Sequence, residues 1–266
     1  MSSITMSKIR PTLLRINIQA QRRTYETRSS DQQTIDLPDG RKLGFAVYGS
    51  PEGKPMLYFH GYPSSRLEAA PIHEMAQRIG IRLIAIDRPG FGLSTPQPNR
   101  QILDWPRDVE KFAQTMKIPH FAVFGLSGGG PFAMACAYAL PRDMLTAVGL
   151  FASGPPWAAG AHHMTITRRI TRFLANNCPV VLNAGLSLFV HCLTWVASTR
   201  PVITRLGRWL EKQDKKHTST VKFEKSHAER IQGLMSMLVD EPFRQGADAA
   251  VHEARLLSSP DWGFQV

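Results

Sequence analysis

The 266-residue sequence predicts an α/β protein with a mixed, mostly parallel, doubly wound sheet and a helical lid insert. Three observations lead to this fold class. Two extended runs flank a Pro-Asp-Gly turn, short apolar strands then alternate with amphipathic helices, and a basic, helix-rich stretch ends that alternation. We expect four regions: a leader or disordered basic tail (1–30), the sheet core (31–154), the helical lid (155–245), and a return helix with the chain end (246–266).

The core region predicts an antiparallel hairpin followed by crossover units. Strands are expected at 34–37, 42–49, 56–59, 83–86, 121–124 and 146–152. In two intervening segments, apolar side chains recur at the spacing of one buried helix face. They are Ile72, Met75, Ala76 and Ile79 in the first helix and Val109, Phe112, Ala113 and Met116 in the second. Asp104 is expected to cap the second helix, and helices should cover both faces of the sheet.

The predicted strand 121–124 runs into a glycine-rich turn. Its four apolar residues predict a fully buried strand. The pentapeptide Gly125-Leu126-Ser127-Gly128-Gly129 then fits G-x-S-x-G, and a small-residue run of helical length follows. Strand, sharp turn and helix are the context of a nucleophile elbow, in which Gly125 and Gly129 avoid Cβ collisions and Ser127 is presented above the sheet. The alternative is a glycine-rich turn with an incidental serine.

The lid region predicts three helical stretches. Those at 165–174 and 201–216 are basic, whereas 178–197 contains twenty residues without a formal charge. That length could just span a bilayer, but polar residues interrupt it, and we expect a buried lid helix over an apolar pocket. Attachment to anionic lipid through the basic flanks stays open. The apolar lid side chains are Leu186, Leu188, Phe189, Leu193 and Trp195.

The net charge of +11 is concentrated outside the core. Residues 1–30 contribute +5 and residues 155–230 contribute +8, which leaves −2 for the rest of the chain. Because no nucleic-acid-binding motif accompanies this charge, we expect no nucleic-acid partner. The three cysteines are widely spaced and lack a C-x-x-C pattern, which argues against a disulfide framework or a zinc site and fits a reducing compartment.

Residues 1–30 have the composition of an organelle presequence. Arginines are spread among serine, threonine and apolar residues, and the first acid is Glu26. The segment Arg22-Arg23-Thr24-Tyr25 is similar to sites at which mitochondrial presequences are cut. A mitochondrial location is therefore expected, although Pro11 interrupts the amphipathic helix of such a segment. A disordered basic tail on a cytoplasmic protein is the alternative.

Three motifs fall at the carboxyl ends of predicted strands, where open α/β sheets bind ligands. They are His60-Gly61-Tyr62-Pro63, the DRPGFGLS loop that begins at Asp87, and Gly125–Gly129. Together, over about residues 34–152, they resemble the α/β-hydrolase superfamily, in the branch with HG-x-P and G-x-S-x-G motifs. Esterases, lipases, proline iminopeptidases and epoxide hydrolases belong to this branch.

The resemblance implies a role for each motif residue. Ser127 would be the nucleophile, and the backbone N–H groups of Tyr62 and Gly128 would form the oxyanion hole. His60 would be a structural residue of its turn rather than the base, and Asp87 would brace its own loop. A serine nucleophile favours acyl transfer. The resemblance thus implies an esterase- or lipase-type serine hydrolase that acts on small-molecule acyl substrates and needs no metal or organic cofactor.

The acid and the histidine of a catalytic triad follow the serine in this fold. After the lid, the sequence offers one helical segment at 246–257 and no later apolar strand, acid turn or histidine. We therefore expect a truncated chain whose sheet lacks the last two strands of the family. Asp248 and His252, four residues apart, are expected to be an exposed helix pair rather than a displaced dyad. The alternatives are a non-catalytic relative that binds a small apolar ligand and a membrane-attached member.

Overall fold

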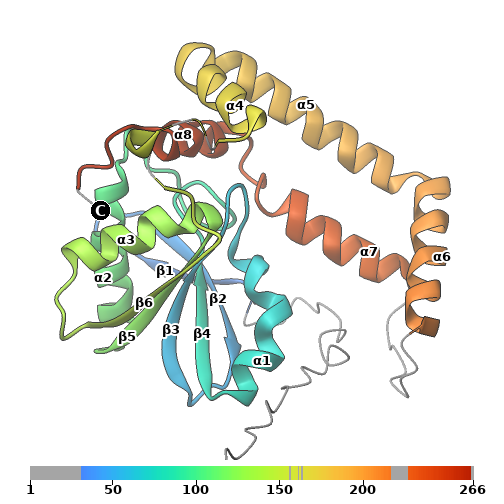
Figure 1. The fold of residues 1–266 in the computed structure, drawn as a ribbon. Coiled ribbons are helices and arrows are strands. Elements are labelled where there is room, and N and C mark those ends of the chain that lie inside the picture. The colour runs from blue at the N-terminus through green and yellow to red at the C-terminus, as the bar shows by residue number, and fades with distance from the viewer. Residues whose placement is uncertain (1–30, 156, 161, 163, 217–226, 265–266) are drawn as a thin grey trace, which may run out of the picture.

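The computed structural model describes residues 31–155, 157–160, 162, 164–216 and 227–264 (Figure 1). The leader at 1–30, with its presequence prediction, lies outside these residues. The core is a six-stranded sheet in the order β1-β2-β4-β3-β5-β6. The strands are β1 (Gln33–Asp36), β2 (Lys42–Gly49), β3 (Lys54–Phe59), β4 (Ile81–Ile86), β5 (Phe121–Leu126) and β6 (Leu145–Phe151).

Strand pairing brings the three motifs to one edge of the sheet. β1 pairs with β2 and β2 with β4 in antiparallel fashion, whereas β3 pairs in parallel with β4 and β5, and β5 with β6. The predicted mixed, mostly parallel sheet is confirmed. Phe59 is in register with both Ile86 and Gly125, so the residues that follow β3, β4 and β5 are neighbours in space.

Helices cover both faces of the sheet, as predicted. On one face, α2 (Trp105–Thr115) and α3 (Gly130–Ala139) pack over the larger core cluster. On the other face, the 3₁₀ segment η3 (Arg66–Ile72) and the short helix α1 (His73–Arg78) cover β2 and β4.

The predicted buried face of the first helix is wrong. Only Ala76 of the four side chains is buried, and Met75 and Ile79 are 43% and 66% exposed. The reason is that α1 starts only at His73, after a 3₁₀ segment with three residues per turn, so the 3.6-residue period does not run through the whole stretch.

The second helix buries Val109, Phe112 and Ala113 as predicted. Asp104 does not cap α2 with its side chain. Instead, its carboxylate accepts the backbone N–H of Gln101 at 2.7 Å within the preceding 3₁₀ turn η4 (Ile102–Asp104).

The prediction of a fully buried strand at 121–124 is also wrong. Phe121 and Val123 are buried under α2 and α3, but Ala122 and Phe124 on the opposite face are only partly covered. The cause is that η3 and α1 lie over β2 and β4 rather than over β5. The edge strand β6 is more open still, and Phe151 is 62% exposed.

The lid forms an arm that leaves the core and returns to it (Figure 1). It consists of α4 (Ile166–Asn177), α5 (Pro179–Ser198), α6 (Arg200–Lys216), α7 (His227–Met235) and the π-helical turn η7 (Ser236–Asp240), and is followed by α8 (Asp248–Leu257). The predicted helices are present, but α5 is not a buried roof. Only 6% of the apolar stretch Pro179–Ala197 is buried, because α5 extends beyond α8 and the sheet.

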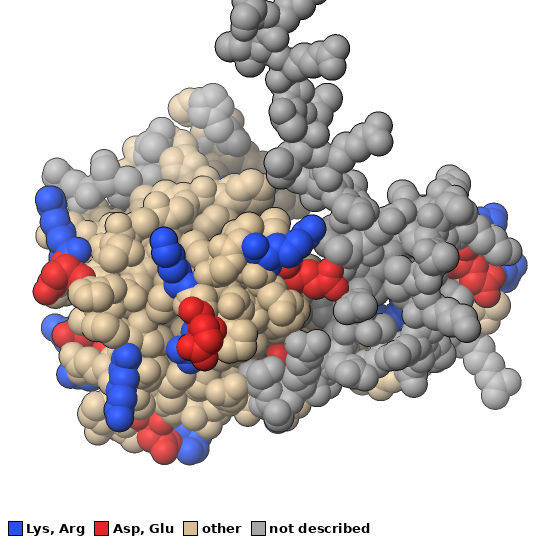
Figure 2. Space-filling model, turned by 90° about the horizontal axis from the view of Figure 1, so that it is seen from below, with Lys and Arg blue, Asp and Glu red and all other residues tan. Residues whose placement is uncertain are grey.

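Charges of both signs are interspersed on the side of the core opposite α8. Figure 2 shows lysine and arginine side chains next to aspartate and glutamate there, with no gathering of basic residues on the coloured surface. The described surface on this side of the core therefore carries mixed charge.

Candidate active site at the strand ends

Ser127 occupies a strained turn between β5 and α3. Its φ of +49° lies in the left-handed region, which is uncommon for a residue with a side chain. A Cβ on Gly125 would come within 2.8 Å of the Gly129 carbonyl oxygen, and a Cβ on Gly129 would collide with the Phe59 carbonyl oxygen. Both glycines are therefore required by the close approach of the backbone, and the Ser127 side chain is exposed.

The loop after β3 lies against this turn. The backbone nitrogen of Tyr62 is 3.1 Å from the position that a Cβ on Gly128 would occupy. The peptide units that precede Tyr62 and Gly128 are thus neighbours next to Ser127. The Tyr62 hydroxyl donates a hydrogen bond of 2.7 Å to the Ala250 carbonyl of α8, which ties the loop to the C-terminal helix.

Arg88 fixes the carbonyl groups of this loop. Its Nη1 donates to the His60 carbonyl at 2.5 Å and its Nη2 to the Gly61 carbonyl at 2.9 Å. In a trans peptide, C=O and N–H point in opposite directions. Fixing the Gly61 carbonyl on one side therefore fixes the direction of the Tyr62 N–H on the other.

His60 is a fully buried member of the same loop. Its Nδ1 lies 2.8 Å from the Gly61 carbonyl oxygen, and its Nε2 accepts the Arg88 backbone N–H at 3.2 Å. An imidazole that donates through Nδ1 and accepts through Nε2 is neutral. Burial, aided by the Arg88 charge, lowers the pKa of His60 well below its usual value. One ring nitrogen is therefore engaged within the loop after β3, and the other binds the loop after β4.

A buried ion cluster connects this loop to α8. Glu253 accepts hydrogen bonds from Arg88 at 2.9 and 2.5 Å and from Arg100 at 2.8 Å. Both guanidinium groups lie over the Phe132 ring, with the Arg88 and Arg100 Cζ atoms 4.7 and 5.6 Å from its centroid. Burial alone would raise the pKa of Glu253, but the two guanidinium charges outweigh it and lower the pKa to about 2.

Glu253 was not singled out from the sequence. The available signal was its position on α8, where Ala250, Glu253 and Ala254 share one helix face and all three are buried. A glutamate on an otherwise apolar face requires a buried cationic partner. No local pattern identifies Arg88 and Arg100 as that partner.

Asp87 braces its own loop. Its carboxylate accepts the backbone N–H groups of Arg66 at 2.6 Å and Leu93 at 2.9 Å, and it pairs with the Arg66 guanidinium at 2.8 Å. Arg66 also pairs with Glu241, just after η7, at 2.5 Å. Asp87 is thus fully engaged within its surroundings.

Asp248 and His252 do not form a dyad. Asp248 is exposed and accepts a hydrogen bond of 2.6 Å from Asn183 of α5. His252 was expected to be exposed but is half-buried, because its Nε2 is hydrogen-bonded to the Arg100 carbonyl oxygen at 3.2 Å. Within the described residues, the Ser127 hydroxyl makes no hydrogen bond to a histidine or a carboxylate.

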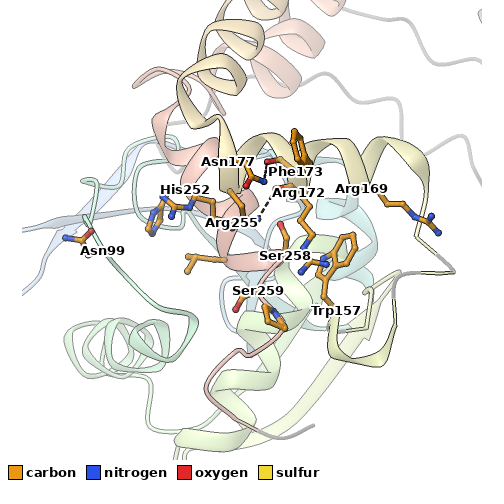
Figure 3. A pocket seen from close by; sticks show the side chains of 13 residues that line it. Asn99, Trp157, Arg169, Arg172, Phe173, Asn177, His252, Arg255, Ser258 and Ser259 are labelled. Carbon is orange, nitrogen blue, oxygen red and sulfur yellow. Dashed lines mark hydrogen bonds between the residues drawn. The ribbon is translucent and has the colours of Figure 1, made fainter.

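A cavity of about 790 Å³ lies on the lid side of α8 (Figure 3). Arg172 and Phe173 of α4, Arg255 and Leu256 of α8, and Trp157 contribute to its wall, and Arg172 stacks on the Trp157 ring at 4.3 Å. No aspartate or glutamate is among its lining residues. The last turn of α8 separates the cavity from the serine turn: Leu256 lines the cavity, and the Cδ1 atom of Leu257 lies 3.3 Å from the Cβ position of Gly128.

Residues 54–164 match the family model described as alpha/beta hydrolase fold. The core of this chain has the α/β-hydrolase fold. The matched segment contains β3 to β6 and all three motifs. In the described part of this α/β-hydrolase-fold chain, no group of three histidine, cysteine, aspartate or glutamate side chains could hold a metal ion.

Two similar proteins and one solved structure place the fold among known hydrolases. Proline iminopeptidases from Xylella fastidiosa and Arabidopsis thaliana are each 31% identical, over 40% and 44% of this chain. The alignments span only 35% and 31% of those relatives, about a third of their length. The structure of a putative aryl esterase from Burkholderia cenocepacia superposes with a TM-score of 0.54 at 17% identity, and covers 85% of this chain and 72% of the esterase.

Proposed function

We propose that this chain is a serine hydrolase of esterase or lipase type, with Ser127 as the nucleophile. The observation that carries the proposal is the exposed Ser127 side chain on a left-handed turn between a strand and a helix, beside the Tyr62 loop. Serine attack on a carbonyl carbon forms an acyl-enzyme and releases the alcohol, thiol or amine. Relatives named proline iminopeptidases and a neighbour named a putative aryl esterase support an acyl substrate, so amides and esters both belong in the substrate set.

The oxyanion hole in this proposal is formed by the backbone N–H groups of Gly128 and Tyr62. Donors held in place before the reaction stabilise the developing negative charge without reorganisation. Gly128 N–H lies at the start of the turn that leads into α3, where the helix dipole also favours negative charge. The Arg88 guanidinium on the Gly61 carbonyl polarises the peptide whose N–H belongs to Tyr62, which strengthens that donor.

Besides the nucleophile and the oxyanion hole, a serine hydrolase needs a general base that activates the serine. Because no histidine or carboxylate of the described residues is hydrogen-bonded to Ser127, a second candidate is a non-catalytic member that binds a small apolar ligand at the same turn. Residual reactivity of a serine with an oxyanion hole but no base is still measurable.

A fluorophosphonate probe separates the two candidates. Folded full-length protein should become labelled, and Ser127→Ala should abolish the labelling. Folding is checked by near-ultraviolet circular dichroism on the same samples. A folded wild-type sample that stays unlabelled overturns the catalytic proposal and leaves the binding protein.

The contribution of Arg88 is tested with a matched control. Arg88 and Arg100 are both buried, both pair with Glu253 and both lie over Phe132, but only Arg88 donates to the carbonyls of the Tyr62 loop. Arg88→Lys should slow labelling about 100-fold, the usual loss for one oxyanion donor, whereas Arg100→Lys should slow it less than about threefold. Equal losses in the two variants would show that Arg88 acts only through stability.

A further inference from the structure

The outward face of α5 is apolar. Val181, Leu188 and Trp195 recur every seven residues and therefore lie on one side of the helix. Together with Phe189 and Val196 they form the apolar ridge, in which Leu188, Phe189 and Trp195 are 64%, 62% and 66% exposed.

The side of α5 that faces the protein is apolar as well, because Leu182 and Leu186 pack in one cluster with Val251 and Ala254 of α8. Asn183 donates to Asp248 of α8, and the Ser187 hydroxyl donates to the Asn183 side chain at 3.3 Å. A surface helix of a soluble protein has polar residues on its outer face, whereas a helix that is apolar all round is buried in a core or in a membrane. The ridge is therefore matched to an apolar medium outside the molecule.

Basic side chains flank the ridge. Residues 166–216 contain nine lysine and arginine residues and two acids, and none of the charged residues is in α5. Arg168 and Arg169 of α4 and Arg205, Arg208 and Lys212 of α6 are exposed. An apolar helix between cationic helices complements an anionic lipid surface, in which the ridge meets the acyl boundary and the flanks meet the headgroups.

We infer that the lid arm docks on an anionic lipid bilayer, with α5 lying in the plane of the interface. A second copy of this chain is a poorer occupant, because it would bring its own basic flanks against the same surface, and like charges oppose association.

The connections of the arm rule out a single crossing by α5. The N-terminal side of the arm is fixed to the core through Ala175 of α4 and Leu182 of α5, which pack on Val251 and Ala254 of α8. The chain beyond α7 is fixed to the same core through the Glu241–Arg66 ion pair. One crossing would leave these two anchors on opposite sides of the membrane.

A return crossing has no segment to make it. Among the described residues, α5 is the one helix long and apolar enough to span. The 17-residue α6 carries eight charged residues, and the sequence 217–226 is about half the length that a spanning helix needs. An in-plane position satisfies both anchors.

Flotation of the full-length chain with vesicles tests the inference. Vesicles of 70% phosphatidylcholine and 30% phosphatidylglycerol should carry the protein, and pure phosphatidylcholine vesicles should carry much less. Leu188→Asn with Phe189→Asn should weaken binding about tenfold or more. Arg205→Gln, Arg208→Gln and Lys212→Gln together should weaken it about 100-fold at low salt. The matched control is Met75→Asn in α1 with Ile79→Asn directly after it, two exposed apolar residues, which should leave binding unchanged.

Four outcomes overturn the inference. No flotation of folded wild-type protein with the anionic vesicles removes the docking site, and equal loss in the α5 and α1 variants removes the ridge as its cause. Vesicle-free self-association that Leu188→Asn with Phe189→Asn abolishes, without flotation, assigns the ridge to a second copy. Retention of the vesicle-bound protein after alkaline carbonate treatment would instead show a spanning helix. None of these measurements depends on the reactivity of Ser127.

Discussion

Replacing Glu253 with glutamine tests how strongly the C-terminal helix is bound to the strand ends. Glutamine keeps the volume of the side chain but leaves the buried Arg88 and Arg100 guanidinium groups without a carboxylate. The pKa of Glu253 is lowered from 4.5 to about 2, and this difference corresponds to about 3 kcal/mol of unfolding free energy at pH 7. Losses on removing one partner of a buried ion pair fall in a similar range of about 3–5 kcal/mol.

The sign of the pH dependence follows from the lowered pKa. The stabilisation is fully present above the unfolded pKa of 4.5 and is lost as pH falls through the folded pKa of about 2. Because glutamine resembles the protonated glutamate, the difference between wild type and Glu253→Gln should shrink from about 3 kcal/mol at pH 7 to about 2 kcal/mol at pH 3.5. Urea denaturation followed by far-ultraviolet circular dichroism measures both values.

An exposed glutamate provides the control. Glu52→Gln in the turn between β2 and β3 should change the unfolding free energy by less than about 0.5 kcal/mol at either pH. A Glu253→Gln variant that loses less than about 1 kcal/mol at pH 7, or whose loss does not depend on pH, would refute the ion cluster as the link between α8 and the strand ends.

Two further predictions concern the serine turn and the cysteines. Gly128→Ala should abolish fluorophosphonate labelling and lower the unfolding free energy, measured by urea denaturation, by about 1–3 kcal/mol. The reason is that the new Cβ would lie 2.6 Å from the Tyr62 Cβ and force the two loops apart. Labelling at the wild-type rate would contradict the close approach. Ellman's reagent should modify the exposed Cys192 within seconds and reach the buried Cys136 only on unfolding. Burial also raises the pKa of the Cys136 thiol, which disfavours the reactive thiolate. Three fast-reacting thiols in native protein would contradict the buried position of Cys136.

Local patterns in the sequence were sufficient to predict the serine turn. Strand, glycines and helix are contiguous, so the need for Gly125 and Gly129 could be predicted from sterics alone. The proximity of His60, Asp87 and Ser127 follows from parallel strands whose carboxyl ends share one edge. These features depend on short-range geometry or on the general topology of α/β sheets.

Long-range partners could not be predicted in the same way. Glu253 is 165 residues from Arg88, and Glu241 is 175 residues from Arg66. A single sequence contains no signal that pairs these charges. The exposed position of α5 was missed for a related reason: apolarity predicts that a surface avoids water, but it does not say whether protein or lipid covers that surface.

The separation between Arg88 and Glu253 sets an order of events during synthesis of the chain. At typical translation rates, roughly 10–30 s pass between the emergence of the two residues from the ribosome. Arg66 meets Asp87 within 21 residues, but Arg88 and Arg100 must wait for α8. An unpaired guanidinium group is too costly to bury. The nascent sheet is therefore expected to keep its strand-end surface hydrated, and the Tyr62 loop to reach its final position only when α8 has left the exit tunnel.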